Sequence, residues 1–339
     1  MTTIGKRILM LAAVAIALQS VATAAGGPDD PGRVAYRVAL AGKRVVLVPI
    51  AMGFDLAQGW AYWIGQDVRA NGGKFEIRDP NWSSQAGAQA ITEEISARPD
   101  VLILHNPDLQ SYARLVQRAQ AAGIYVVQIE EIGAARADAY VGSDWVNLGQ
   151  LEGEAVARSC GVGTSGKLGL VQGDEVSSGS LDQLAGIRMA LQKYPKMSIV
   201  AQPTSHWDAS KARTVATTML QQHPDLCGVI DFWDGSAQGT AAAIRDAHLV
   251  GKVALVTNGG GEQVDCDALQ KGDFTALINT DVRRETRDIN NVIKILLQSN
   301  VKPGTLKVSL FTPEVITTKA DLTPDTCWRL KDLRPGATK

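Results

Sequence analysis

Segments typical of strands and of helices alternate along almost the whole chain, and this alternation limits the fold more than any other feature of the sequence. The run Val45-Val46-Leu47-Val48 is apolar and β-branched, and it leads through a loop with Gly53 into residues 55–63, whose aromatic residues have helical spacing. The same order then recurs, with strands expected at 74–78, 101–105, 125–129 and 140–142 and helices at 86–97 and 109–122. Strands that alternate with helices of this length predict right-handed βαβ units and a parallel sheet.

The alternation then starts again, which predicts a second lobe. Strands are expected at 168–172, 198–202, 229–232, 253–257 and 276–279, and helices at 147–159, 181–193, 211–222, 236–247 and 262–270. A helix at 285–297 and an extended segment at 308–317 follow. The breaks between the two sets contain no flexible Gly/Ser-rich or Pro-rich linker, which favours a hinge made of several short crossings. The sequence thus predicts an α/β protein of two Rossmann-like lobes with parallel sheets.

The N-terminus has the pattern of a secretory signal peptide. Lys6 and Arg7 precede an apolar stretch at 8–18, and Ala22 and Ala24 supply a small-residue cleavage pattern. The stretch is shorter than the roughly 20 residues that a membrane-spanning helix needs. We therefore expect a signal peptide at 1–25, cleavage near Ala24, a polar leader at 26–42, and a mature protein in the periplasm.

Four cysteines follow in this oxidising compartment, where three pairings are possible. Cys160 ends a helix that leads into one expected strand and Cys227 immediately precedes another, so neighbouring strands could bring the two together. We favour Cys160 with Cys227, which leaves Cys266 with Cys327. Free buried thiols are the alternative, and no His/Cys spacing indicates zinc.

Charge and motifs exclude several functions. The formal net charge is −1 and no basic run occurs, so nucleic-acid binding is not expected. The glycine-rich run at 161–167 nearly matches a phosphate-binding loop, but it precedes a strand and lacks the Ser or Thr after the lysine. The adjacent residues Ser205, His206 and Asp208 cannot adopt the geometry of a catalytic triad. We predict neither an enzyme nor a cofactor or metal site. The arginines near residue 285 are interpreted as a solvated helix face or as a permease contact.

Ligands of parallel α/β proteins bind beyond the carboxyl ends of the strands. This rule makes Asp55, Gln58 and Trp60, which follow the first strand, the first candidates for ligand contact. Core packing is the alternative for Trp60 and for Trp63.

Several short motifs occur along the alternating segments: Leu104-His105-Asn106-Pro107, Val141-Gly142-Ser143-Asp144, Ala201-Gln202-Pro203 with Trp207-Asp208, and His223-Pro224-Asp225. With the order and spacing of the segments, they resemble the ribose- and galactose-type periplasmic sugar-binding proteins of ABC importers, over about residues 43–317. The resemblance implies a type I periplasmic binding protein fold with a three-crossover hinge. Its N-terminal lobe would comprise 43–143 and 281–308, and its C-terminal lobe 144–280 with a tail at 309–339.

The resemblance also implies a set of ligand-binding residues between the lobes. Carried over by position, they are Asp55, Gln58, Trp60, Asn106, Glu130, Gln183, Trp207, Trp233, Asn258 and Asn279, with Thr280 as an alternative to the last. Two departures stand out. Glu130-Glu131 lacks the basic member of the family's pair, and Asn258-Gly259-Gly260-Gly261 lacks the aspartate of its Gly-Phe-Asp-Gly loop. The cleft should therefore hold more indole and fewer arginines than a ribose site.

The expected function is capture of a small sugar or polyol by a monomer that delivers it to the membrane permease of an ABC transporter. Indole faces and amide groups suit sugar rings and hydroxyls. The alternative is that Glu130, Glu131 and Asp55 with several tryptophans cage an amine or a quaternary ammonium ligand, with a sensor kinase in place of the permease as partner. Core packing of the tryptophans, loop capping by Asn106 and Asn258, and a solvated Glu131 are the structural alternatives.

Overall fold

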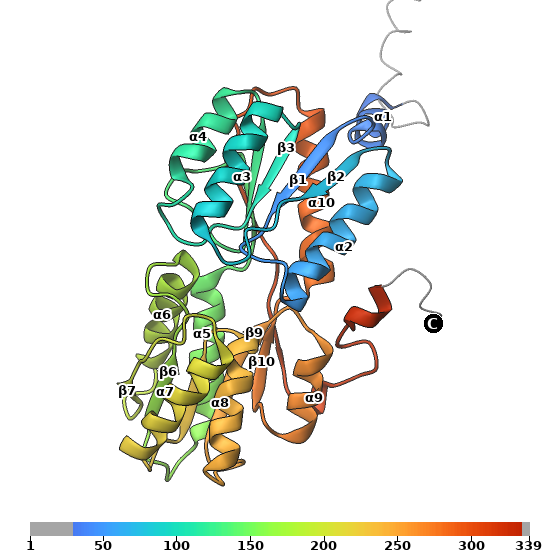
Figure 1. The fold of residues 1–339 in the computed structure, drawn as a ribbon. Helices are drawn as coiled ribbons and strands as arrows, with labels where there is room; N and C mark the ends of the chain where they lie inside the picture. The colour runs from blue at the N-terminus through green and yellow to red at the C-terminus, as the bar shows by residue number, and fades with distance from the viewer. Residues whose placement is uncertain (1–29, 334–339) are drawn as a thin grey trace, which may run out of the picture.

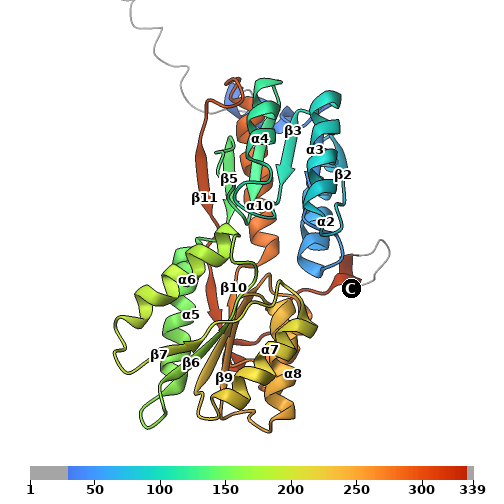
Figure 2. The ribbon, with the colours of Figure 1, turned by 60° about the vertical axis from the view of Figure 1, so that its left-hand side comes forward.

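The structure, a computed structural model, describes residues 30–333 and contains two lobes, each built around a six-stranded sheet (Figures 1 and 2). The expected signal peptide lies outside the described residues. None of the described helices has the length and apolar character needed to cross a membrane.

The first sheet has the order β11-β5-β4-β3-β1-β2, and all its pairs are parallel. Its strands are β1 (Arg44–Val48), β2 (Lys74–Ile77), β3 (Val101–Leu104), β4 (Tyr125–Ile129), β5 (Ala139–Gly142) and β11 (Val308–Phe311). The helices of this lobe are α1 (Pro31–Val38), α2 (Asp55–Ala70), α3 (Ser84–Ala97), α4 (Ala113–Ala121) and α10 (Val282–Gln298).

The second sheet has the order β12-β10-β9-β8-β6-β7, in which only β12 runs antiparallel. Its strands are β6 (Lys167–Val171), β7 (Ser198–Ala201), β8 (Gly228–Asp231), β9 (Ala254–Gly259), β10 (Ala276–Asn279) and β12 (Val315–Thr317). The helices are α5 (Trp145–Cys160), α6 (Ser178–Leu191), α7 (Ala209–Gln222), α8 (Asp234–Asp246) and α9 (Gln263–Lys271), followed by the 3₁₀ turns η1 (Lys319–Asp321) and η2 (Leu330–Leu333).

The all-apolar strand β1 shows why the sheets are covered on both faces. Val45 and Leu47 pack into a core with α2 and α10, whereas Val46 and Val48 pack into a second core with α3 and α4. Successive side chains of a strand point to opposite faces, so a strand buried on both sides must be apolar throughout. The fold class predicted from the alternation is confirmed.

Both favoured cysteine pairs form disulfides. Cys160 and Cys227 are joined with their Cα atoms 5.3 Å apart, and Cys266 and Cys327 with theirs 6.2 Å apart. The first bond joins the end of α5 to the residue before β8, within the core of the second lobe.

Three expectations differ from the structure. The segment expected to be extended over 308–317 divides between the sheets: β11 pairs with β5, and β12 pairs with β10, so residues 309–311 lie in the first lobe and not the second. The leader contains α1, whose N-terminus is capped by the Asp30 side chain. The helix expected from residue 109 begins at Ala113, because the Asp108 carboxylate accepts hydrogen bonds from the backbone of Gln110 and Ser111 and holds a turn there.

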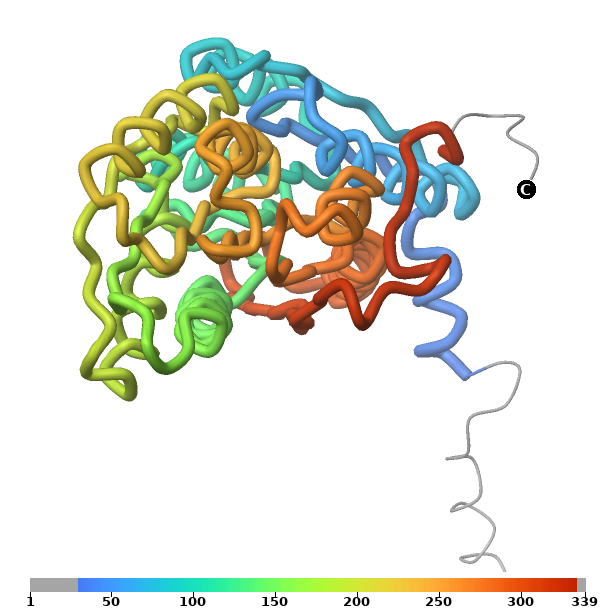
Figure 3. The backbone as a smooth tube through the Cα atoms, turned by 90° about the horizontal axis from the view of Figure 1, so that it is seen from below, coloured from blue at the N-terminus to red at the C-terminus, as the bar shows by residue number. Residues whose placement is uncertain are grey.

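The C-terminal segment also returns to the first lobe (Figures 1 and 3). Trp328, next to the disulfide at Cys327, packs edge-on against Trp63 of α2 with ring centroids 5.2 Å apart. Leu330 and Leu333 of η2 pack against the same core. The tail was expected in the C-terminal lobe, but it contacts both lobes, because its apolar side chains are buried against α2 of the first lobe.

Candidate ligand-binding site

A cavity between the lobes is surrounded by the ends of the parallel strands. Each lining residue lies in a segment that follows the carboxyl end of a strand, up to the first turn of the next helix, or, in β9, at the carboxyl end of the strand itself. The lining residues are Ile50, Phe54, Leu56, Trp82, His105, Asn106, Pro107, Glu130, Glu131, Trp145, Trp207, Phe232, Trp233, Asn258, Gly259 and Thr280. This is the position at which open parallel sheets bind their ligands.

Aromatic rings from both lobes form most of the wall. Phe54 of the first lobe lies 5.6 Å, centroid to centroid, from Trp82 of the same lobe and 5.6 Å from Trp233 of the second. Trp145, Trp207 and Phe232 complete the aromatic lining. Phe54 and Trp233 therefore meet edge-on between the lobes, and a cavity lined by so many aromatic rings is suited to contact a ring or a compact apolar group.

Backbone geometry at Trp207 indicates that the site holds this ring in place at some energetic cost. Trp207 has φ of 61°, in the left-handed region that bulky residues rarely adopt. Its indole covers Gly173, where an added Cβ would lie 2.0 Å from the ring. Position 173 therefore accepts only glycine beside this indole.

Two amides supply polar groups of fixed orientation. The Nδ2 of Asn106 donates to the backbone oxygen of Glu131 at 2.7 Å, which leaves its Oδ1 buried without a partner among the described residues. The Nδ2 of Asn258 donates to the carbonyl oxygen of Phe232 at 2.9 Å and to Oε1 of Glu152 at 3.0 Å. Unpaired buried polar atoms are costly, so Asn106 Oδ1 is a ready acceptor for a ligand donor.

The cleft disfavours ionised groups unless a ligand compensates them. Burial, and then the neighbouring Glu131 carboxylate, raise the pKa of Glu130 above its usual range. Burial lowers the pKa of His105 to about 3, so this imidazole is neutral at physiological pH. Neither lysine nor arginine is present among the residues that line the cavity.

Glu131 joins the two lobes directly. It follows β4 in the first lobe, and its Oε2 accepts hydrogen bonds from Ser178 Oγ at 2.7 Å and from the backbone N–H of Gly179 at 2.8 Å. Both donors lie at the N-terminus of α6 in the second lobe, where a carboxylate is favoured by the helix dipole. The solvated position considered for Glu131 is wrong, because the side chain is 7% exposed.

Five of the ten predicted ligand-binding residues line the cavity: Asn106, Glu130, Trp207, Trp233 and Asn258. Trp60 does not, and the stacking role predicted for it is wrong. Its ring is fully buried in the core of the first lobe, and its Nε1 donates to Glu285 Oε2 at 2.7 Å. Phe54, six residues before Trp60, lines the cavity wall instead, because residue 60 is on the inner face of α2.

The other four predicted residues also lie outside the lining. Asp55 and Gln58 are in the first turn of α2, where Phe54 and Leu56 face the cavity instead. Gln183 is buried on α6 and donates to Glu152 Oε2 at 2.8 Å. Asn279 accepts from the backbone of Asp281 at 2.8 Å, and the alternative position, Thr280, lines the cavity.

The sequence reasoning missed Phe54, Trp82 and Trp145. Trp82 follows β2 and Trp145 follows β5, so the rule about the carboxyl ends of strands could have found both. Trp82 is 48% exposed at the rim.

Comparisons with known proteins agree with this architecture. A family model described as "periplasmic binding protein domain" matches residues 47–300. The D-ribose/D-allose-binding protein of Pseudomonas aeruginosa is 28% identical over 177 residues, 49% of this chain and 53% of that protein. The D-apiose import binding protein of Paraburkholderia graminis is 26% identical over 190 residues, 56% of this chain and 60% of that protein. The chain thus matches little more than half the length of these curated relatives.

Solved structures show the same fold. A periplasmic solute-binding protein from Actinobacillus succinogenes with bound D-allose has a TM-score of 0.73 at 18% identity, covering 82% of this chain and 98% of that one. A myo-inositol-binding protein from Caulobacter has a TM-score of 0.74 at 18% identity, covering 82% and 94%. With the family model matching well over half of its residues, the chain belongs to the periplasmic binding protein domain family.

Proposed function

We propose that the protein binds a small sugar or polyol between its lobes in the periplasm and delivers it, chemically unchanged, to the permease of an ABC importer. Several relatives are named for such ligands, among them D-ribose/D-allose, D-apiose and xylitol. The two lobes would be the units that close around the ligand, as hinged two-lobed binding proteins do.

The observation that carries this proposal is the pairing of aromatic faces from both lobes with fixed amides at the ends of the strands. An indole face packs against the C–H face of a sugar ring, while Asn106 and Asn258 are positioned to pair with hydroxyl groups. Glu130, kept protonated by burial, can both donate and accept.

A second candidate is an organic cation, with a sensor kinase as the partner that reads the bound form. It is favoured by one specific feature: Glu130 and Glu131 line the same cavity as four indoles, and the lining contains neither lysine nor arginine. A cation over an indole face gains about 0.5–2 kcal/mol, depending on its desolvation. Such a ligand would also restore the charge of Glu130.

A thermal-shift screen of sugars, polyols and methylated amines, followed by calorimetric titration, separates these candidates. A ligand at 100 times its dissociation constant stabilises the folded protein by about 2.7 kcal/mol. Binding of a cation should weaken as ionic strength rises, whereas binding of a neutral sugar should not. A shift from amines only would contradict the sugar proposal.

Variants locate the site. Trp207→Ala and Trp233→Ala should weaken binding, whereas Tyr62→Ala, on α2 outside the lining, should not. Normal binding by both tryptophan variants would contradict the assignment of the site. N-terminal sequencing of the exported protein tests cleavage near Ala24, and light scattering tests the expected monomer.

A further inference from the structure

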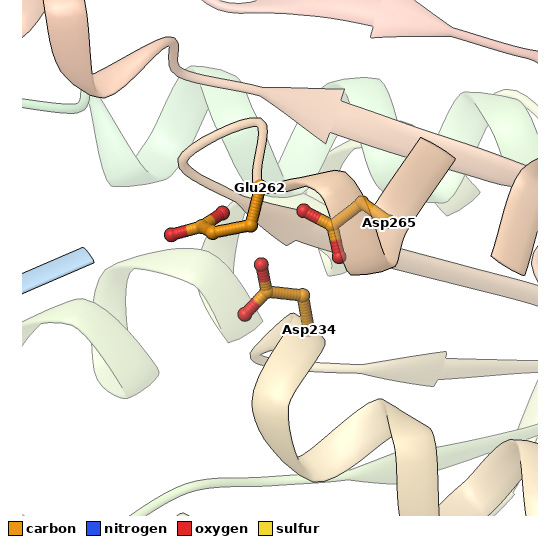
Figure 4. A group of neighbouring side chains, drawn as sticks. All are labelled: Asp234, Glu262 and Asp265. Atoms are coloured by element: carbon orange, nitrogen blue, oxygen red, sulfur yellow. The ribbon is translucent and has the colours of Figure 1, made fainter. Parts of the chain in front are cut away.

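Three carboxylates converge inside the second lobe, outside the lining of the ligand cavity. Asp234 is the first residue of α8, Glu262 is the N-cap residue of α9, and Asp265 lies in the first turn of α9. One oxygen from each lies within 4.8 Å of the others, and Figure 4 shows the three side chains gathered at one place, with Asp234 below Glu262 and Asp265 in this view. Their exposed fractions are 5%, 4% and 0%.

Nothing in the described part of the chain neutralises this cluster. No lysine, arginine or histidine in residues 30–333 forms a salt bridge with any of the three. Moreover, both carboxyl oxygens of Asp265 and Oε2 of Glu262 are buried without a hydrogen-bond partner. A buried carboxylate with no donor is unfavourable, and burial raises the pKa of all three groups well above their usual range. These oxygens therefore have the capacity to accept a ligand.

The surrounding backbone holds the cluster firmly. A Cβ at Gly259 would lie 1.9 Å from Asp234 Oδ2, so a side chain at this position would displace that carboxylate. The N–H of Trp328 donates to the carbonyl of Gly261 at 2.9 Å, and its indole donates to that of Gly260 at 3.1 Å. The disulfide at Cys266 ties the first turn of α9 to the same tail. Preorganised oxygens lower the cost of assembling a cation site.

We propose that Asp234, Glu262 and Asp265 form a binding site for Ca²⁺. Oxygen ligands are those that Ca²⁺ prefers, at about 2.3–2.6 Å, so two oxygens across one ion are at most about 5 Å apart. The spread of the three oxygens in the structure fits that span. Mg²⁺ binds at about 2.1 Å and keeps several waters, which a buried cluster accommodates less well. Trp233 and Gly259, which line the ligand cavity, adjoin Asp234 in sequence or in space, so the ion would also fix that wall.

The test uses the full mature protein without any sugar, so its outcome is independent of the proposed function. After treatment with EDTA, addition of CaCl2 should raise the melting temperature, and calorimetry should give one ion per chain. Tb³⁺ should bind at the same place and emit when tryptophan is excited, because Trp233 precedes Asp234 and Trp328 pairs with Glu262. Ca²⁺ should displace this Tb³⁺ signal.

Variants make the test specific. Asp265→Asn and Glu262→Gln should weaken Ca²⁺ binding at least about tenfold, since affinity depends on the charge of the ligand set. Removal of one of three like charges relieves repulsion, so the EDTA-treated variants should melt no lower than the EDTA-treated wild type. Asp267→Asn, an exposed position on α9, is the matched control and should bind Ca²⁺ normally.

Two outcomes would overturn the proposal. One is the absence of any Ca²⁺ or Tb³⁺ response at millimolar ion at both about pH 7.5 and about pH 8.5, which would show that the carboxyl groups share protons instead. The other is a Ca²⁺ response that survives unchanged in the combined Glu262→Gln and Asp265→Asn variant, which would place the ion elsewhere.

Discussion

Removal of the Glu131 carboxylate should shift the equilibrium of the two lobes toward the open form. Glu131 belongs to the first lobe, and its carboxylate accepts hydrogen bonds from Ser178 and Gly179 at the start of α6 in the second lobe. When the lobes separate, Glu131 moves away from both donors, so the two hydrogen bonds stabilise only the closed arrangement. We therefore expect Glu131→Ala to weaken closure without unfolding either lobe.

The magnitude follows from the two bonds and the burial of the charge. A hydrogen bond to a charged group contributes about 1.5–3 kcal/mol. Burial of the charge opposes this stabilisation. It raises the pKa of Glu131 above its usual range, and the hydrogen bonds from Ser178 and Gly179 offset only part of that rise. A net contribution of about 2 kcal/mol corresponds to about 30-fold in the closing equilibrium.

Small-angle scattering and ligand titration measure this change together. If the ligand-free wild type is mostly closed, ligand-free Glu131→Ala should have a larger radius of gyration than the wild type. If the ligand-free wild type is mostly open, the ligand affinity of Glu131→Ala should instead fall by up to about 30-fold. Glu131→Gln keeps an oxygen that both donors can reach and is the matched control, with a smaller effect. Ser178→Ala removes one donor and should give an intermediate effect. Unchanged scattering and unchanged affinity in Glu131→Ala would refute the reasoning.

Three further predictions concern stability. Burial raises the pKa of Glu152 in the folded state to about 8. Protonated Glu152 therefore contributes its full stability below about pH 4.5, and this contribution is lost as the pH rises toward 8, by up to about 1.4 kcal/mol per pH unit. Glu152→Gln should flatten this slope in thermal unfolding, and an unchanged slope would contradict the raised pKa of Glu152. Trp60→Phe leaves Glu285 Oε2 buried without its donor and should cost about 1–3 kcal/mol in urea unfolding; a loss below about 0.5 kcal/mol would count against the buried hydrogen bond. Replacing Cys160 and Cys227 together by alanine should cost about 2–4 kcal/mol, and a wild-type midpoint in the same assay would contradict it.

Local patterns of the sequence were sufficient for the architecture. The apolar run at β1 and its successors have the composition of strands covered on both faces, and the helical segments between them require parallel connections. The resemblance to sugar-binding proteins implied that Asn106, Trp207 and Trp233 lie at the cleft, and all three line the cavity, because the carboxyl ends of parallel strands share one edge. The pairing of Cys160 with Cys227 followed from the same neighbour relations, whereas Cys266 with Cys327 was the pair that remained.

Only the tertiary structure decided which side chains face the cavity and which lobe each segment joins. Trp60 and Phe54 are six residues apart, and their opposite roles depend on the rotation of α2 about its axis against α10, which no local pattern specifies. The carboxylates of Asp234 and Glu262 meet only because β8 and β9 are neighbours in the sheet. Local sequence determines the type of each element through its own periodicity. Side-chain partners depend instead on long-range packing, which is settled only when the whole chain has folded.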